Sequence, residues 1–308
     1  MNFGYNSGMR KFSLTRLIPK SRDFLYWLMP RLLDFSDFRR YQSRIQSVES
    51  QIIELQNRIR HAGEIDSYYL ELLSIISPIE SNIQLTRVGS KFDGGYLVPK
   101  NYLYKKQWIT IGLGFNVDFE NDLISNYSFV NSFDHTISNR PAKLLKGVTW
   151  HKLGWGISDK DNELVSLKEI MNLSCINYDD SWCLKFDIEG NEWNVLDEIN
   201  NLKYLPDIIC CEIHDLKWNE DQYVNQEKIR MLKELFFNYF CVNINGNNFS
   251  ANMMSKFIEV HDTIELTLIK KTAKLTYQIT STEGNKLFLV KNHPNDVYGR
   301  QTHTSRIE

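Results

Sequence analysis

Several features that the sequence lacks limit what this protein can be. The chain has 308 residues and no run of 18 or more apolar residues, so we expect no transmembrane helix. Its N-terminus lacks the apolar region and small-residue cleavage site of a secretory signal. The five cysteines form no CxxC pair with zinc spacing, and most lie in apolar runs. This pattern predicts reduced thiols in a buried core and a cytoplasmic protein.

A strong charge of either sign is also missing. The net charge is −2, so no global basic field indicates nucleic acid as a partner. Hydrophobic residues make up 42% of the chain, which is enough for one α/β domain of about 200 residues and an appendage.

Residues 1–31 are locally basic. They carry six Lys or Arg residues against one acid, Asp23, with aromatic and aliphatic residues between them. A basic amphipathic stretch of this kind can lie on an anionic membrane surface, which would place the protein peripherally at the inner membrane face. The alternative is a helix that packs against a partner subunit or against the chain's own domain.

Residues 38–62 show a heptad pattern. Apolar residues recur at alternating spacings of three and four, at Phe38, Tyr41, Ile45, Val48, Ile52, Leu55, Ile59 and Ala62. Such a stripe on a free helix predicts self-association into a homo-oligomer. The alternative is a stripe that packs on the globular domain. Gly63 predicts a break, and residues 64–77 predict a second short helix that ends before Pro78.

From about residue 83 onward, predicted strands alternate with predicted helices. The strands are expected at 108–115, 128–133, 148–153, 182–186, 207–213, 239–244 and 263–269, and helices at 118–126, 162–171 and 225–237. This alternation predicts an α/β fold with a doubly wound, mostly parallel seven-stranded sheet. Only a loop precedes the last strand, which favours an antiparallel direction for it. Residues 274–290 predict a hairpin. We therefore expect an N-terminal helical segment at 1–63, a main domain at 64–292 and a frayed tail at 293–308.

The most informative segment is Lys185–Trp193, where a predicted strand opens into a predicted helix. Asp187 and Glu189 lie at this junction, and Gly190 allows a tight turn. Ligands of open α/β sheets bind at the carboxyl ends of the strands, so acids at this position are candidates for chemistry. The alternative is a solvated acidic turn.

The next predicted strand ends with Glu212 and His214, which are two residues apart and therefore point to the same side. Adjacent parallel strands place their ends together, so we expect Asp187, Glu189, Glu212 and His214 to converge. Two roles stay open for this group. A histidine held by a carboxylate can act as a general base at neutral pH. Alternatively, Asp187, Glu212 and His214 can hold Mg²⁺ or another divalent cation that lowers the pKa of a bound hydroxyl.

A glycine turn follows the first predicted strand. Gly112 and Gly114 would let a ligand approach the backbone closely, although a single GxG is a weak signal. The third glycine of a GxGxxG fingerprint is absent, which disfavours a nicotinamide cofactor. Asp134 ends the next strand and can accept both hydroxyls of a ribose. The alternative role for Asp134 is local capping with Thr136.

Ser158 and Asp159 follow the third predicted strand. They are candidates for contacts with an adenine ring, and the competing interpretation is a cap of the following helix.

Together these segments resemble the FkbM-like S-adenosylmethionine-dependent methyltransferases. The resemblance covers about residues 83–270 and depends on Ile111–Glu120, Phe133–Thr136, Lys185–Trp193 and Cys211–His214. The upstream segment Arg87–Tyr96 looks like the RxGxxxDGGY-type entry motif of a subgroup. Phe115 and Asn116 stand where further glycines are usual.

The resemblance implies a Rossmann-like class I methyltransferase fold that binds S-adenosylmethionine and methylates oxygen, often a sugar hydroxyl of a glycan or glycoconjugate. It places Gly112, Gly114 and Asn116 near the methionine end of the cofactor, and Arg87, Asp93 and Tyr96 in a lid. Proton removal from the acceptor would fall to the histidine–carboxylate cluster. Two other interpretations stay open at this point. One is a nicotinamide-dependent oxidoreductase, and the other is an oligomeric scaffold that binds a nucleotide cofactor without transferase activity.

Overall fold

The computed structural model describes residues 35–81, 83–156, 163–176, 181–247, 250, 252–254, 259–271, 279–281 and 291–292. The predicted basic segment at 1–31, the tail at 293–308, and Ser158 and Asp159 lie outside the described residues. Contacts divide the chain into two units, with the boundary between Ala62 and Gly63.

Helix α2 (Phe35–Ile76) is continuous, so the predicted break at Gly63 is wrong. Glycine inside a helix costs about 1 kcal/mol relative to alanine, and good helix formers on both sides of Gly63 offset that cost. The last part of α2 is amphipathic and buries one face in the core of the second unit, through Tyr69, Leu72, Leu73 and Ile76.

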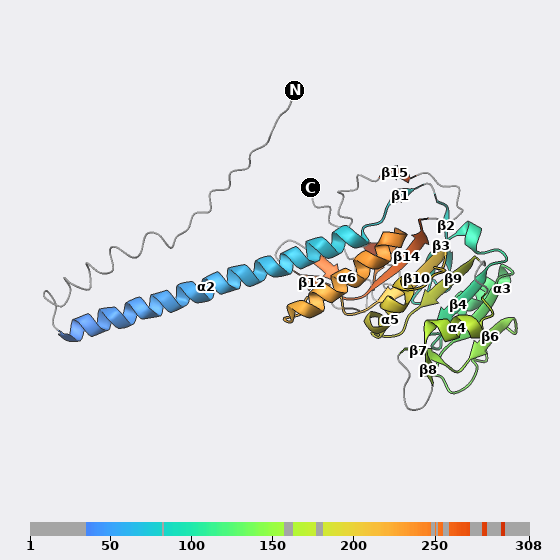
Figure 1. The fold of residues 1–308 in the computed structure, drawn as a ribbon, viewed down its shortest axis with the longest axis horizontal. Helices are drawn as coiled ribbons and strands as arrows, with labels where there is room; N and C mark the ends of the chain where they lie inside the picture. Colours follow the sequence, from blue (N-terminus) through green and yellow to red (C-terminus); the bar gives the residue numbers. More distant parts are fainter. Residues whose placement is uncertain are drawn as a thin grey trace, which may run out of the picture. The chain divides into compact units, whose positions relative to one another are not determined.

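The main sheet has the strand order β6-β5-β4-β9-β10-β14-β11-β16 (Figure 1). Its bounds are β4 (Gln107–Ile111), β5 (Phe129–Phe133), β6 (Val148–His151), β9 (Trp182–Phe186), β10 (Ile208–Ile213), β11 (Tyr239–Gly246), β14 (Ile264–Lys270) and β16 (Lys291–Asn292). All seven predicted strands are present, and the two-residue strand β16 joins at the edge next to β11.

Strand directions confirm the predicted mixed sheet. Strands β6, β5, β4, β9 and β10 are mutually parallel, whereas β14 is antiparallel to both β10 and β11. The dinucleotide-binding order is 3-2-1-4-5-6, and it has no antiparallel strand between its fifth and sixth strands. The insertion of β14 therefore separates this sheet from that fold.

Apolar residues alternate across the sheet and create two cores. Ile109 and Ile111 of β4 face the core that also contains the end of α2 and helices α4 (Leu167–Leu173), α5 (Glu192–Asn200) and α6 (Gln222–Asn238). Trp108 faces the opposite core, with α3 (Asp118–Ser125) and the hairpin of β2 (Leu85–Val88) and β3 (Tyr96–Pro99). A 3-10 turn, η3 (Lys100–Tyr102), follows β3. Helices thus cover both faces of the sheet, as the alternation predicted.

In the described part of the chain, three further short strand pairs form separate two-stranded sheets outside the main sheet. They are β7 (Gly154–Trp155) with β8 (Leu164–Val165), β12 (Asn252–Met254) with β13 (Glu259–His261), and β1 (Glu80–Ser81) with β15 (Ile279–Ser281). Of the hairpin predicted at 274–290, only Ile279–Ser281 is described, and this segment pairs with β1; the rest of the predicted hairpin lies outside the described residues.

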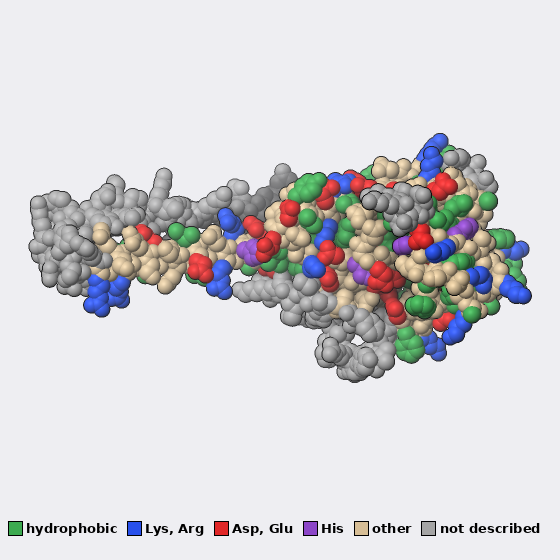
Figure 2. Space-filling model, turned by 90° about the horizontal axis from the view of Figure 1, so that it is seen from below, with side chains coloured by type: hydrophobic (Ala, Val, Ile, Leu, Met, Phe, Trp, Pro, Cys, Tyr) green, Lys and Arg blue, Asp and Glu red, His purple; other side chains and the backbone are tan. Residues whose placement is uncertain are grey.

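The surface carries both charge signs. On the face shown in Figure 2, acidic side chains form small groups, some beside histidine, and basic side chains are scattered between them. Within the described part of the chain, no helix combines the length and the apolar character needed to cross a membrane.

Candidate active site

The carboxyl ends of β9 and β10 bring the predicted acids and histidine together. These two strands are adjacent and parallel, so Asp187, directly after β9, lies near Glu212 and His214 at the end of β10. Ligand atoms of these three side chains lie within 4.8 Å of one another. His214 Nε2 is 3.7 Å from Glu212 Oε1 and 3.6 Å from Oε2 of Glu189.

A fifth group, Glu192, was not predicted and holds His214 most closely. Its Oε1 atom lies 3.1 Å from Nδ1 of His214 and also accepts the N–H of Gly190. The Glu192 side chain is 0% exposed, whereas that of Glu189 is 86% exposed. Glu192 occupies the first turn of α5, where an acid ordinarily stabilises the helix N-terminus. Glu189 precedes the helix with a φ of +55°, so helical spacing does not relate the two acids, and the available signal was an acid in the first turn of the helix predicted after Asp187.

The carboxylates around His214 decide its protonation. Burial alone would lower the pKa of His214, but the hydrogen bond to Glu192 and the charges of Glu192, Glu212 and Asp187 raise it to about 9. The ring therefore holds its proton at pH 7. This differs from the prediction of a base that is ready at neutral pH, because the sequence did not reveal how many carboxylates face the ring.

Burial and mutual repulsion act on the carboxylates themselves. Burial, followed by the charge of Asp187, raises the pKa of Glu212 to about 8, and burial raises the pKa of Asp187. Glu265 on β14 was not predicted, and it is the cross-strand partner of Glu212. Burial raises the pKa of Glu265 to about 7. Like charges opposite each other on neighbouring strands are destabilising, so this wall of the site favours a proton or a cation.

The glycine turn after β4 packs tightly on the end of β9. Gly112 has a φ of +78°, and a Cβ added there would lie 1.6 Å from the carbonyl oxygen of Asp187. Lys185 Nζ donates to the Gly112 carbonyl at 2.7 Å. Gly114 has a φ of +57° with nothing within 4 Å of an added Cβ, and the neighbouring Phe115 is 94% exposed. The turn is therefore closed toward β9 and open at Gly114.

Asp134, at the end of β5, holds this turn in place. Its Oδ2 accepts the N–H of Gly114 at 2.7 Å, and its Oδ1 accepts the N–H and the hydroxyl of Thr136 at 2.8 and 2.7 Å. Burial by itself would raise the pKa of Asp134, but these hydrogen bonds lower it, so the side chain is a carboxylate. The local interaction with Thr136, which the sequence left open as an alternative, is therefore present.

The hairpin of β2 and β3 carries the three residues that were predicted to form a lid: Arg87 in β2, Asp93 in the loop and Tyr96 at the start of β3. Arg87 donates to the carbonyls of Ser90 (2.7 Å) and Phe92 (2.8 Å), so its guanidinium braces the loop from within. Tyr96 is buried, so it belongs to the core and not to a lid. Asp93 reaches the acidic wall, where one ligand atom from each of Asp93, Glu212 and Glu265 lies within 4.8 Å of the others.

Asn116 connects this loop to the glycine turn. Its amide Nδ2 donates to the carbonyl of Asp93 at 2.7 Å, and its Oδ1 accepts the N–H of Asp118 at the start of α3. In the described structure Asn116 thus positions two neighbouring segments.

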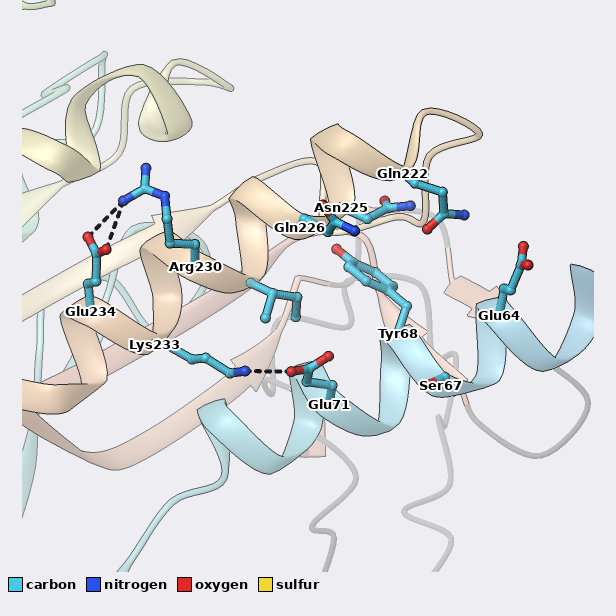
Figure 3. Close-up of a pocket in the computed structure, with 11 residues that line it drawn as sticks. Glu64, Ser67, Tyr68, Glu71, Gln222, Asn225, Gln226, Arg230, Lys233 and Glu234 are labelled. Atoms are coloured by element: carbon cyan, nitrogen blue, oxygen red, sulfur yellow. Dashed lines mark hydrogen bonds and ion pairs between the residues drawn. The ribbon is translucent and has the colours of Figure 1, made fainter.

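A separate groove of about 690 Å³ lies between the end of α2 and α6 (Figure 3). Lys233 pairs with Glu71 across it at 2.6 Å, and Arg230 pairs with Glu234 at 2.8 Å. These charges neutralise one another, and the groove belongs to the helical layer and not to the strand ends. It therefore offers less chemistry than the cluster around His214.

Comparison with known families decides the class of the domain. A family described as "Methyltransferase FkbM domain" matches residues 82–240, which is about half of the chain and contains every predicted site residue. This chain belongs to the FkbM methyltransferase family. The match decides against the nicotinamide interpretation. No protein with a curated description is significantly similar in sequence.

Several solved structures resemble this FkbM methyltransferase only distantly. A putative hemolysin from Streptococcus thermophilus is 10% identical with a TM-score of 0.35, and the match covers 63% of this chain and 64% of that one. The Methanococcus jannaschii fibrillarin pre-rRNA processing protein is 9% identical with a TM-score of 0.34, covering 61% and 83%. A 16S rRNA (adenine(1408)-N(1))-methyltransferase from Catenulisporales acidiphilia is 8% identical with a TM-score of 0.28, covering 60% and 98%. This FkbM methyltransferase thus spans just under two thirds of the Streptococcus protein.

The family implies S-adenosylmethionine as cofactor, and the glycine turn fits such a ligand. Gly114 is open, so a cofactor can approach its backbone without meeting a side chain. Asp134 has less capacity left to bind the ribose of such a cofactor. A carboxylate has about four acceptor positions, and Gly114 and Thr136 use three of them. The ribose role of Asp134 stays a prediction, as does the adenine role of Ser158 and Asp159.

Proposed function

We propose that this protein is an S-adenosylmethionine-dependent O-methyltransferase whose acceptor is a sugar hydroxyl of a glycan or glycoconjugate. The observation that carries the proposal is His214, which buried Glu192 holds beside Asp187 and Glu212 at the carboxyl ends of the parallel strands. Carboxyl side chains accept hydrogen bonds from hydroxyls and, where they are protonated, also donate one, so a group of them suits an acceptor with several neighbouring hydroxyls.

In this proposal, the chain's own residues position the acceptor and remove its proton. S-adenosylmethionine supplies the methyl group, and its own sulfur leaves as a neutral thioether. The protein therefore has to align the acceptor oxygen with the methyl carbon and remove the proton of the acceptor hydroxyl. Neutral His214 would accept the hydroxyl proton, and Glu192 would stabilise the resulting imidazolium. Asp187 and Glu212 would orient the acceptor through its hydroxyls.

The test is methyl transfer from labelled S-adenosylmethionine. We expect cofactor binding in calorimetry and label transfer to glycans or simple glycosides, but not to catechols or peptides. Binding without transfer to any sugar would contradict the acceptor class and leave the family intact. A folded protein that does not bind the cofactor would instead support the scaffold interpretation.

The same cluster fits a divalent ion such as Mg²⁺ or Mn²⁺. Asp187, Glu212 and His214 offer one imidazole and two carboxylates within 4.8 Å. Asp187 Oδ1 is buried, and it has no hydrogen-bond partner among the described residues. A cation here would relieve the repulsion among the buried carboxylates. Because Nδ1 of His214 lies against Glu192, the ion would occupy Nε2 in place of a proton, and it would then lower the pKa of a bound acceptor hydroxyl instead of His214 acting as the base.

We expect Mn²⁺ or Mg²⁺ to stabilise the protein against heat. At an ion concentration 100 times the dissociation constant, the gain is about 2.7 kcal/mol, or several degrees in melting temperature. EDTA should reverse the shift and Asp187→Asn should remove it, whereas Glu234→Gln on α6 should keep it. A shift of equal size in Asp187→Asn would place the ion elsewhere.

A further inference from the structure

The first part of α2 exposes a row of large apolar side chains. Ile45, Val48, Ile52, Leu55 and Ile59 are 45–64% exposed, and they lie alternately three and four residues apart. A repeat of 3.5 residues per turn is the repeat of helices that supercoil around one another, and an isolated straight helix has 3.6. The same stripe continues to Tyr69, Leu73 and Ile76, which are buried in the core of the second unit. Among the residues that the structure describes, only the later part of the stripe is covered by the chain itself.

The residue types in the middle of this stripe favour a particular number of strands. In heptad terms, the a positions are Ile45, Ile52 and Ile59, and the d positions are Val48, Leu55 and Ala62. β-Branched isoleucine at a with leucine at d favours two-stranded coiled coils, whereas isoleucine at both positions favours larger assemblies. The central heptad, with Ile52 and Leu55, has the two-stranded combination.

The flanking charges specify the direction of the partner helix. Arg44 is at a g position and Glu49 is at the next e position, so a parallel partner places Arg44 of one chain beside Glu49 of the other. An antiparallel partner that overlaps fully pairs g positions with each other. That arrangement would place Arg44 against Arg58, a repulsive pair.

We propose that residues 38–62 of two copies of this chain form a parallel two-stranded coiled coil. The segment is about 37 Å long at 1.5 Å per residue and forms three and a half heptads. In this dimer both methyltransferase domains follow the same end of the coiled coil. The proposal is independent of the proposed function, because its tests measure mass and proximity.

The first test is the mass of the full-length protein in solution by light scattering. We expect twice 36.3 kDa for the natural chain. Ile52→Lys with Leu55→Lys should halve that mass, because two lysines at the seam would face their copies. Ile53→Lys is the matched control, since Ile53 is equally apolar and 58% exposed but lies at position b, away from the seam. A monomeric or trimeric natural protein would overturn the proposal, as would dissociation by Ile53→Lys.

The second test is direction. Ala62 lies at a d position, so in a parallel dimer it faces its own copy, and Ala62→Cys should form a disulfide under mild oxidation. In the fully overlapping antiparallel dimer residue 62 of one chain lies level with residue 38 of the other, so the two copies of residue 62 would be offset by about 24 residues, or about 36 Å, which is beyond the roughly 7 Å limit for a disulfide. The exposed Cys175 should first be changed to Ser. Arg44→Glu should weaken the dimer and Arg44→Glu with Glu49→Arg should restore it. Failure of the Ala62→Cys cross-link would overturn the parallel direction.

Discussion

Gly112→Ala is expected to destabilise the methyltransferase domain by about 4 kcal/mol or more, or to prevent its folding. The added Cβ would lie 1.6 Å from the carbonyl oxygen of Asp187, and the φ of +78° is itself unfavourable for alanine. Neither strand can move away easily. Gly112 donates its N–H to Phe133, and the N–H of Asp187 donates to Ile111, both at 3.0 Å. The clash therefore falls on backbone that is fixed from two sides.

Gly114→Ala is the matched control for this effect. Its φ is also positive, at +57°, but its Cβ would meet nothing within 4 Å. We expect a cost of about 1–2 kcal/mol, which is the left-handed penalty alone. Urea unfolding of both variants measures the difference. Equal costs would show that the Gly112 turn is not packed against Asp187 as described.

His214→Ala is expected to lower kcat for methyl transfer by about 10²- to 10⁴-fold, the usual contribution of a general base. The cofactor affinity should change little, because His214 belongs to the acceptor side of the site in this proposal. Calorimetry with S-adenosylmethionine separates the two quantities. Full turnover by His214→Ala would remove His214 from the role of base.

The pH dependence of kcat/KM distinguishes a base role of His214 from a merely structural role. A base must be neutral, and the pKa of His214 is about 9, so kcat/KM without metal should rise with pH and level off above about 9. Glu192→Gln removes the leading cause of the raised pKa. The rise in its profile should move to lower pH by about one unit or more, because a hydrogen bond to a charged group is worth about 1.5–3 kcal/mol. An unmoved profile would assign the rise to another group.

The same pKa shift has a consequence for stability, and its sign is defined. The pKa of His214 is raised from an ordinary 6.5 to about 9, so the folded protein binds the proton more tightly than the unfolded chain. This contribution is complete below about pH 6.5 and is lost as the pH rises through about 9. Glu192→Gln should flatten that loss, and unfolding titrations between pH 6 and 10 measure it.

The fold was predictable from the sequence because the hydrophobic period of each segment and the length of that segment indicated the same type of element. Buried strands such as Trp182–Phe186, which is apolar except for Lys185, are short apolar segments between helical patterns, and β9 has those bounds in the structure. The antiparallel last strand followed from the missing crossover helix. Gly63 was misread because propensity is weak evidence inside a long helix, where neighbouring residues decide.

The site was predictable where residues follow the ends of parallel strands. Asp187, Glu212 and His214 met this criterion, and the structure brings them together. Glu265 could not be found in this way, because it lies at the beginning of an antiparallel strand and still reaches the same edge of the sheet. The burial of Tyr96 was not predicted, because the burial of a side chain depends on tertiary contacts that spacing in the sequence does not encode.

The antiparallel direction of β14 also bears on how such a site can diversify. Because β14 runs in this direction, Glu265, which faces Glu212 in the acidic cluster, lies at the start of the strand. The loop that contains β12 and β13 comes immediately before it. Asn247, at the beginning of that loop, donates to Glu212, and the loop returns to the sheet just before Glu265. Changes of length or sequence there can reshape the wall while the β4, β9 and β10 ends stay as they are. Acceptor choice and the proton-handling residues can thus evolve on separate segments of one chain.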